Sequence, residues 1–368
     1  MRHYGRLLIA LLIILPAACG SVSFEGGRTV SISGSGVVQG IITSNGATGA
    51  SFTIPPGTGT ISNALSNAAD NDIFLLEKGT YFDNVLIDKS LSITGAGATL
   101  TTVDGQHKGS VFTIPSGVTT TLADMTIQNG YSGIAGGIFN DGTINLNNVL
   151  ITGNAATYGG GIYNIGMITM NSGTSITGNT ATYGKGSGIF NTGTITINGG
   201  TISDNNAGYN ASYYGGGIYN DIGGTIIMNG GTISRNPAIY GGGIYNAGTV
   251  TMNGGTISDN LADNGGGIEN HGTVTMNSGS SITGNTAYNG GGIVNYGTVT
   301  MNSGCSITDN TGYTNGGGIY NIGTVTLNSG SSITGNIGQH GGGGIYNTGT
   351  ITMNGGTISN NKPDNVFP

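Results

Sequence analysis

The sequence is poor in charge and cysteine, has no tryptophan, and has no long apolar run after its first residues. Only 7% of its 368 residues are charged, against about a quarter in an average soluble domain. Nine Lys and Arg stand against 16 Asp and Glu, and such a chain lacks the basic patch that nucleic-acid binding requires. The abundant residue is glycine, with 75 copies. A disordered glycine-rich tract is excluded because apolar residues recur at fixed positions.

The N-terminus has the pattern of an export signal. Arg2 and Arg6 precede an apolar stretch, 7–15, that is too short to span a bilayer. The next residues, LPAACGS, resemble the lipobox of bacterial lipoproteins, with Pro16 in place of the usual aliphatic residue. We therefore expect residues 1–18 to be a signal peptide and Cys19 to be lipidated, which anchors the chain in the cell envelope or at the surface. Cleavage without lipidation, followed by secretion, is the alternative.

If Cys19 carries the lipid, Cys305 has no cysteine partner, which rules out a disulfide framework. Cys305 aligns with Thr and Ser in other repeats, so we interpret it as a small filler at a turn. Loss of Arg2 and Arg6 with the signal peptide leaves seven basic and 16 acidic residues in the mature chain.

A glycine-rich phrase, GGGIYN, recurs nine times in slightly varied form. Copies are 24 to 29 residues apart, a period typical of solenoids. Leucine-rich repeats need a Leu framework that is absent, and propeller blades need about 40 residues. The Ile of the phrase stands at positions 138, 162, 189, 218, 244, 268, 293, 319 and 345.

Each unit divides into three short strand patterns, such as GIYN, TVTMN and TISDN, in which residues alternate between two faces. Four columns stay aliphatic and are expected to face inward; in one unit they are Ile244, Val250, Met252 and Ile257. Stacked coils bury such columns as one continuous core. Parallel crossovers are right-handed in nearly all proteins. We therefore predict an all-β, right-handed parallel β-helix with about 25 residues and three short strands per coil.

Three columns of Asn repeat in all nine units. They begin at Asn140, Asn147 and Asn154 and end at Asn347, Asn354 and Asn361. Asn adopts left-handed backbone easily and suits turns, and stacked Asn side chains form hydrogen-bonded ladders. We expect structural corners here, and we expect the triple Gly to serve close coil packing.

The region before the repeats is expected to start the β-helix. Residues 19–57 are predicted to be a linker or an irregular β segment. Residues 58–130 are predicted to form a cap and the first coils, because Ile61, Ala64, Leu65 and Ala68 have helical spacing and a short helix there would cover the open core. The nine-repeat β-helix is predicted over 131–362 and a tail over 363–368.

The stretch 61–105, followed by GGGIYN and TVTMNGGTISDN repeats, resembles the right-handed β-helix proteins of the pectin-lyase-like superfamily. It is most similar to adhesin-like surface proteins and to the repeats of polymorphic outer membrane proteins. The FxxN phrase of that group stands here as ISDN or ITGN, and no C-terminal barrel pattern is present in the sequence. The resemblance implies a surface protein that a lipid or another export route holds in place.

Catalytic candidates are few. Between Tyr131 and Pro368 the only Lys and Arg residues are Lys185, Arg235 and Lys362. Many β-helix proteins of this shape are lyases, esterases or hydrolases, which use clustered carboxylates with Arg or Lys. GTYFDN at 79–84 only partly resembles the GxYxE phrase of pectinesterases. If the chain is an enzyme, the candidate site comprises Asp83, Asp88 and Asp104.

Two further clusters have a structural and a functional interpretation. Asp204, Arg235 and Asp259 should stack on successive coils, as an exposed salt bridge or as an acid/base cluster. Glu269 and His271 share a strand face, but two ligands are too few for a metal site. No metal or other cofactor is expected.

Two outward columns are candidate binding surfaces. One contains Thr pairs at 249/251, 273/275, 298/300, 324/326 and 350/352, which resemble the ice-binding faces of some β-solenoid antifreeze proteins, although Thr is also a common strand residue. The other is an aromatic ladder, whose rings would stack on sugars or on one another; its candidate residues are Tyr163, Phe190, Tyr219, Tyr245, Tyr320 and Tyr346, with Phe139 preceding them and Glu269 and Val294 interrupting them.

These observations predict a non-enzymatic β-helix of the cell envelope with an adhesive or surface-structural role. A carbohydrate-active enzyme of the same fold is the alternative, and ice binding is the third. Expected partners are a polysaccharide or a neighbouring cell surface, and the membrane through the lipid, but not nucleic acid. The sequence leaves the oligomeric state open.

Overall fold

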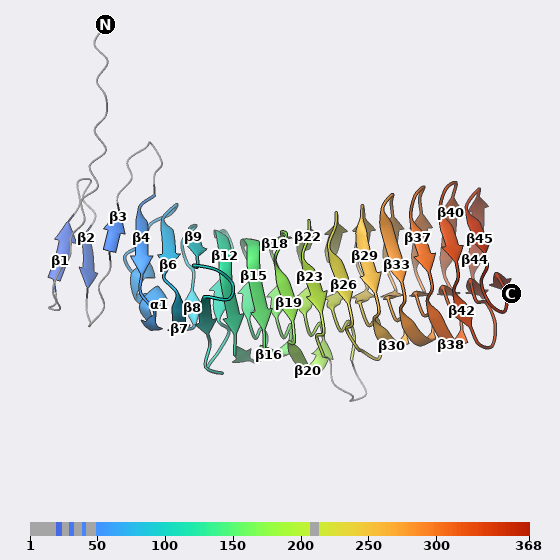
Figure 1. Cartoon of the computed structure of the whole chain (residues 1–368), viewed down its shortest axis with the longest axis horizontal. Helices are drawn as coiled ribbons and strands as arrows, with labels where there is room; N and C mark the ends of the chain where they lie inside the picture. Colours follow the sequence, from blue (N-terminus) through green and yellow to red (C-terminus); the bar gives the residue numbers. More distant parts are fainter. Residues whose placement is uncertain (1–19, 24–28, 33–38, 42–48, 207–212) are drawn as a thin grey trace, which may run out of the picture.

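The chain forms a straight rod of stacked β coils. The computed structural model describes residues 20–23, 29–32, 39–41, 49–206 and 213–368, with side chains from residue 49 onward. Within these residues the coils follow one another from the N-terminal to the C-terminal end (Figure 1). The predicted fold class is confirmed: the rod is a right-handed parallel β-helix with about 25 residues per coil. Residues 1–18, the expected signal peptide, and Cys19 lie outside the described part.

The GIYN phrases form one sheet, called sheet 2 here. It has 12 parallel strands in the described residues, and equivalent residues pair in register, as Ile244 with Ile268 and Asn246 with Asn270. At about 4.8 Å per coil, 12 coils span about 50 Å. The strands are β8 (Val85–Leu86), β11 (Phe112–Ile114), β14 (Ile138–Asn140), β17 (Ile162–Asn164), β21 (Ile189–Asn191), β24 (Ile218–Asn220), β27 (Ile244–Asn246), β31 (Ile268–Asn270), β35 (Ile293–Asn295), β39 (Ile319–Asn321), β43 (Ile345–Asn347) and β46 (Val366–Phe367).

The TVTM and TIS phrases form a 25-stranded sheet, called sheet 1, in the described residues. Its TVTM row contains β4 (Ser51–Ile54), β6 (Ile73–Leu76), β9 (Ser92–Thr94), β18 (Met167–Met170), β22 (Thr194–Ile197), β25 (Thr225–Met228), β28 (Thr249–Met252), β32 (Thr273–Met276), β36 (Thr298–Met301), β40 (Thr324–Asn328) and β44 (Thr350–Asn354). Its TIS row contains β5 (Gly57–Thr58), β7 (Gly79–Phe82), β10 (Thr101–Asp104), β19 (Ser175–Thr177), β23 (Thr201–Ser203), β26 (Thr232–Ser234), β29 (Gly255–Ser258), β33 (Ser280–Thr283), β37 (Ser306–Thr308), β41 (Ser332–Thr334) and β45 (Thr357–Ser359). The long strands β12 (Thr119–Gln128) and β15 (Thr143–Thr152) run through both rows.

Three strands lie before or beside the first coil. β1 (Gly20–Ser23) and β2 (Thr29–Ile32) pair antiparallel with each other, and β3 (Gln39–Ile41) pairs antiparallel with β4. β4 itself pairs parallel with β6, so regular coil stacking begins within the segment that the sequence suggested was a linker or irregular β structure.

A fourth short strand follows the TIS phrase in part of the rod, beyond the three predicted per coil. These strands form two small parallel sheets, together called sheet 3. They use the segment between the third Asn and the triple Gly, whose length varies from copy to copy. The strands are β13 (Tyr131–Ser132), β16 (Ala155–Tyr158) and β20 (Thr180–Lys185) in one sheet, and β30 (Leu261–Asn264), β34 (Thr286–Asn289), β38 (Thr311–Asn315) and β42 (Ile337–Gly338) in the other.

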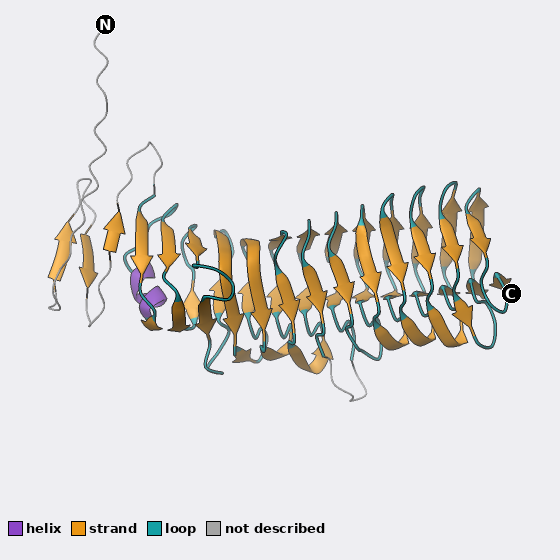
Figure 2. Ribbon diagram, viewed as in Figure 1, coloured by secondary structure: helices purple, strands orange, loops and turns teal. Residues whose placement is uncertain are grey.

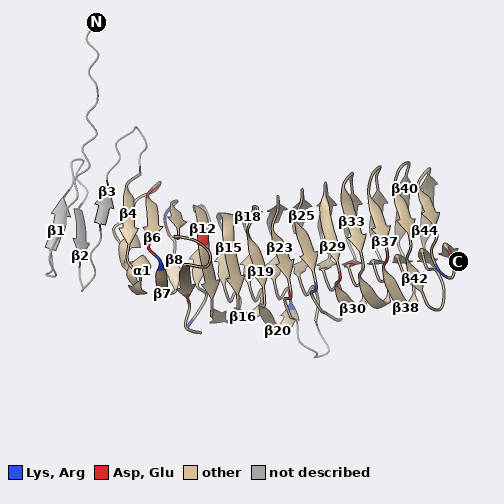
Figure 3. Cartoon of the chain, viewed as in Figure 1, with Lys and Arg blue, Asp and Glu red and all other residues tan. Residues whose placement is uncertain are grey.

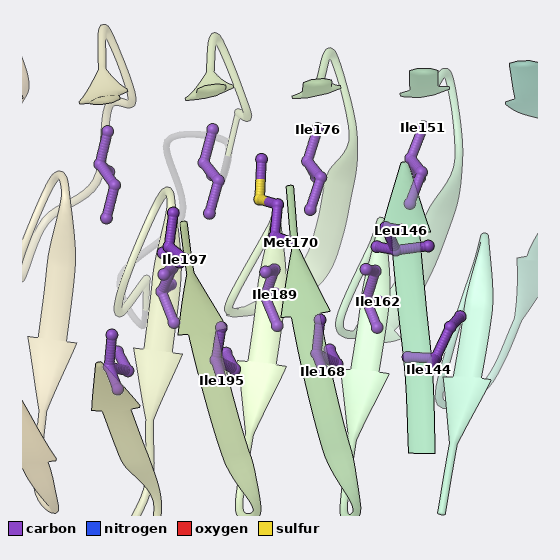
Figure 4. Packing of buried hydrophobic residues seen from close by; sticks show 14 of the residues in the cluster. Ile144, Leu146, Ile151, Ile162, Ile168, Met170, Ile176, Ile189, Ile195 and Ile197 are labelled. Atoms are coloured by element: carbon purple, nitrogen blue, oxygen red, sulfur yellow. The ribbon is translucent and has the colours of Figure 1, made fainter. Parts of the chain in front are cut away.

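The four aliphatic columns fill the interior, as predicted. Figure 4 shows Ile144, Ile168 and Ile195 stacked coil over coil, with Leu146 and Met170 in the adjacent column. These side chains are buried. Each fully buried aliphatic side chain stabilises the fold by about 1.5–3 kcal/mol, and repetition along the rod makes this the main stabilising term.

Two of the three Asn columns are buried ladders. In sheet 2, Asn246 Nδ2 donates to Asn270 Oδ1 at 2.8 Å, and the same bond repeats from Asn140 to Asn347. In the column that follows TIS, Asn260 Nδ2 donates to Asn285 Oδ1 at 2.9 Å. The column that contains Asn253 is half-buried or exposed, and its amides donate in the opposite direction along the rod. The predicted hydrogen-bonded ladders are therefore confirmed.

The left-handed backbone is not in these Asn columns. At the third column it lies one residue earlier, where Asp204, Arg235, Asp259, Asp309 and Asn360 have φ between 54° and 57° and the other four repeats have Gly. The sequence argument placed this conformation one residue too late. The triple Gly serves packing as expected, because a Cβ on Gly243 would lie 2.6 Å from Gly267 O.

Helix α1 (Thr60–Leu65) lies at the N-terminal end of the coils and is the one α-helix in the described part of the chain (Figure 2). Ile61 and Leu65 are buried in the core. The first turn is capped from outside the helix: Asp83 accepts hydrogen bonds from the Ser62 N–H at 3.0 Å and from the Ser62 Oγ at 2.6 Å. The expected capping helix is therefore present.

At the last coil the tail completes two ladders. Asn361 Nδ2 donates to Asn365 Oδ1 at 3.1 Å, and the Phe367 ring stacks on Tyr346 at 5.3 Å. The inward column of sheet 1 is less covered there, and Met353 is 48% exposed.

Candidate functional site

The enzyme candidates are held by hydrogen bonds from the chain itself. The Asp83 carboxylate caps α1 through Ser62. The Asp104 carboxylate accepts bonds from the Gln106 N–H at 2.9 Å, Gln128 Nε2 at 3.0 Å and Asn129 Nδ2 at 2.7 Å. Burial alone would raise the Asp104 pKa, but these hydrogen bonds outweigh it and the pKa is lowered.

Asp88 is on the surface, where it forms an ion pair with Lys89 at 2.9 Å. Asp83 and Asp104 thus have clear structural roles, and the contacts of Asp88 are local. The charged residues are scattered along the rod (Figure 3). No group of three or more His, Cys, Asp or Glu in the described part of the chain is arranged to hold a metal ion.

The aromatic ladder stacks on itself. Tyr163, Phe190, Tyr219 and Tyr245 follow one another with ring centroids 4.7, 5.1 and 5.0 Å apart and planes within 13°. Phe139 stacks before them, and Tyr320 stacks on Tyr346 further along the rod. Because each ring covers the faces of its neighbours, the faces inside the ladder are closed to a sugar.

Burial also marks the ladder as structural. Phe190 and Tyr219 are buried, although they lie on the outer side of sheet 2. Desolvation by this burial raises the pKa of Tyr219 to about 12 and also raises the pKa of Tyr245. Two more tyrosines cover the ladder edge, since the Tyr214 ring stacks on Tyr240 and meets Tyr245 edge-on at 5.0 Å.

In the coils of Glu269 and Val294 the aromatic position moves two residues along the chain, to His271 and Tyr296. The His271 ring lies 5.2 Å from Tyr245 and stacks on Tyr296 at 4.5 Å. Its Nε2 is 3.0 Å from Glu269 Oε1, so the two side chains meet as expected, although Glu269 lies on β31 and His271 directly follows that strand.

Glu269 is only 4% exposed, and its Oε2 is buried with no hydrogen-bond partner. Burial raises the pKa of this carboxyl group, and the hydrogen bond from His271 opposes the shift. The pair therefore fills the break in the ladder, with its carboxyl group shielded from solvent.

The predicted salt bridge forms between two neighbouring coils. Arg235 Nε and Nη2 bond to the two carboxylate oxygens of Asp204 at 3.0 and 2.8 Å. The guanidinium hydrogen bond lowers the Asp204 pKa. Both side chains are exposed, so the pair contributes less than about 1 kcal/mol.

The Thr pairs form two straight columns on sheet 1. Thr249 pairs with Thr273, and Thr251 with Thr275, and the same register continues to Thr350 and Thr352. Every Thr in these columns is at least partly exposed. The result is a regular, uncharged hydroxyl surface over five coils.

Sheet 3 carries an exposed aromatic surface that the sequence reasoning missed. Tyr288 and Tyr313 lie one coil apart, 57% and 45% exposed, with ring centroids 6.1 Å apart. Leu261 and Ile337 are exposed on the strands on either side. The sequence signal was the alternation in TAYN and TGYTN, where a buried small residue precedes an outward Tyr.

Cys19, the lipidation candidate, lies outside the described residues. Cys305 is a buried free thiol, and burial raises its pKa to about 11, consistent with the predicted filler role. None of the described helices has the length and apolar character needed to cross a membrane. No protein-family model, curated protein or solved structure matches this chain.

Proposed function

We propose that the protein is a non-enzymatic, exported β-helix of the cell envelope that acts in adhesion or as a surface-structural rod. The GGGIYN and TISDN phrases support this through their resemblance to adhesin-like members of the pectin-lyase-like superfamily. The lipobox-like LPAACGS supports attachment through a lipid on Cys19. Expected partners are a polysaccharide or a neighbouring cell surface.

The observation that carries the proposal is the continuity of the ladders. The buried amide ladder of sheet 2 runs from Asn140 to Asn347, and the second runs from Asn154 to Asn365. Each coil is thus joined to the next by side-chain bonds as well as by the backbone bonds of parallel strands. Coils joined in this way bend little, which suits a protein that holds a binding surface away from a membrane.

The runner-up, a carbohydrate-active enzyme, is less well supported. Asp83 and Asp104 are bonded to Ser62, Gln106 and neighbouring amides, so proton transfer to a substrate by either carboxylate would compete with these bonds. A general acid or base must also reach the reacting atoms directly or through one water.

The test combines surface display with binding. The full chain is expressed with its signal in a bacterial host, and adhesion of the cells to immobilised polysaccharides and to other cells is measured. The matched control is Cys19→Ser, which removes the proposed lipid site. We expect adhesion with the native chain and release of the protein into the medium with the variant. Absence of any adhesion, with the protein shown to be displayed, contradicts the adhesive role and leaves only the surface-structural one.

A second candidate, ice binding, is favoured by the in-register Thr columns alone. A rigid, uncharged hydroxyl lattice can order water along the rod. The test measures ice recrystallisation with the native chain and with Thr275→Lys, which places a charge in the centre of the lattice. Thr283→Lys, on the neighbouring TIS row, is the control. Equal recrystallisation in the presence and absence of the native chain excludes this function.

A further inference from the structure

The outer side of β30, β34, β38 and β42 is a compact surface that carries exposed aromatic and aliphatic side chains. One column is Leu261, Thr286, Thr311 and Ile337, which pair in register across the four strands. The alternating inward positions are small and buried, as at Ala287 and Gly312. The surface is therefore flat at its base, with larger side chains standing on it.

The second column places two phenol rings in the centre. Tyr288 and Tyr313 lie on adjacent strands and meet edge-on, with planes 60° apart. No other ring contacts them in the described residues, whereas inner rings of the sheet 2 ladder, such as Phe190 and Tyr219, are covered on both faces. Asp263 is exposed on β30, and Gln339 is exposed directly after β42.

This combination fits a saccharide. An exposed aromatic ring binds the C–H face of a pyranose, while hydroxyl, carboxylate and amide groups exchange hydrogen bonds with its hydroxyls. Here Thr286 and Thr311 lie in the column next to the rings, and Asp263 and Gln339 lie at the two ends of the ring column. Because the two rings are one coil apart, a sugar chain that runs along the rod axis contacts both.

Charge decides the class of saccharide. No Lys or Arg occurs between Asn236 and Asn361, and the exposed ionisable groups of this region include Asp259, Asp263 and Asp309. A polyuronate or a sulfated glycan needs basic partners for its anionic groups. Here it would meet exposed carboxylates and no Lys or Arg, with the imidazoles of His271 and His340 as the only exposed basic-type groups. A neutral polysaccharide avoids both problems.

We propose that the outer face of β30, β34, β38 and β42 binds a neutral polysaccharide, with Tyr288 and Tyr313 as its stacking platform. This inference rests on the proposed adhesive function and names its contact surface and ligand class.

The test is affinity electrophoresis of the purified full chain in native gels that contain hydroxyethyl cellulose, laminarin or mannan, with alginate and polygalacturonate as anionic probes. The variants are the double changes Tyr288→Ala with Tyr313→Ala, and Tyr288→Phe with Tyr313→Phe. Tyr183→Ala is the matched control, because Tyr183 is 73% exposed on β20, outside this surface. Circular dichroism verifies that every variant is folded.

We expect at least one neutral polysaccharide to retard the native chain and neither anionic probe to do so. Loss of both rings should weaken binding about tenfold or more, while the Phe variant and Tyr183→Ala bind like the native chain. If the double Ala variant binds a neutral polysaccharide as tightly as the native chain does, this surface is wrong but the adhesive function stands. Retardation by the anionic probes alone overturns the ligand class. If no probe binds and displayed cells do not adhere, this binding surface and the adhesive role both fail.

Discussion

Replacement of one buried ladder amide tests whether the Asn columns hold the coils together. Asn246 Nδ2 donates to Gly248 O at 3.2 Å, Asn270 Oδ1 at 2.8 Å and Thr273 O at 3.1 Å. Its Oδ1 accepts a bond from Asn220 Nδ2 at 2.8 Å. Asn246→Ala removes all four bonds and leaves a small buried cavity.

The magnitude follows from the groups left behind. Each buried polar group that loses a partner costs about 1–3 kcal/mol, and the amides of Asn220 and Asn270 are the two directly affected. With the cavity, which adds about 1 kcal/mol, we expect Asn246→Ala to lower the free energy of unfolding by about 3–7 kcal/mol.

The same coil supplies the control. Asn253 donates to Asn229 Oδ1 at 3.0 Å and accepts from Asn277 at 2.8 Å, but it is exposed, so water replaces its partners. Asn253→Ala should cost less than about 0.5 kcal/mol. Urea unfolding measures both variants, and hydrogen exchange locates the loosened coils because repeat proteins do not always unfold in one step. Equal costs for the two variants would refute the reasoning.

Three further predictions concern ionisation and access. Burial raises the Glu269 pKa, so the folded state favours the protonated carboxyl group. The free energy of unfolding is then greatest at low pH and falls as the pH rises above the unfolded-state pKa of 4.5. Glu269→Gln should flatten this part of a profile of melting temperature against pH. Burial likewise raises the Tyr219 pKa to about 12 and raises the Tyr245 pKa. An absorbance titration should therefore show phenols that ionise late, and the free energy of unfolding should fall as the pH rises above about 10. Tyr219→Phe should remove one of these late-ionising phenols. The Cys305 thiol is buried with its pKa raised to about 11; a thiol reagent should leave it unmodified in the native chain and modify it in urea, and fast reaction in buffer would contradict the core packing.

The repeat made most of the fold predictable. Inward columns such as Ile244 and Val250 follow from alternation within strands and from the need of each coil to match the coil beneath it. The buried Asn ladders were predictable for the same reason, because an amide in the same position of every coil can bond to its copy. The left-handed residue was misplaced by one position, since Asp259 and Asn260 are both residue types that suit such a turn.

The surface was less predictable because it depends on how side chains pack between coils. The outward position of Tyr245 follows from alternation, but its covered faces follow from a ring spacing near 5 Å. The move of the aromatic position to His271 and Tyr296 can be predicted only from the three-dimensional register of two neighbouring coils. Tyr288 was missed because its strand lies in the segment that varies most between copies.

The central claim is that the protein binds polysaccharide without catalysis. The most direct test is to incubate the purified chain with neutral and anionic polysaccharides. Retention of the protein by each polymer and the length of the polymer are then measured in the same samples. We predict retention on a neutral polysaccharide with no shortening of the chains. Shortening of any polymer by the native chain, abolished in Asp83→Asn or Asp104→Asn, would contradict the account.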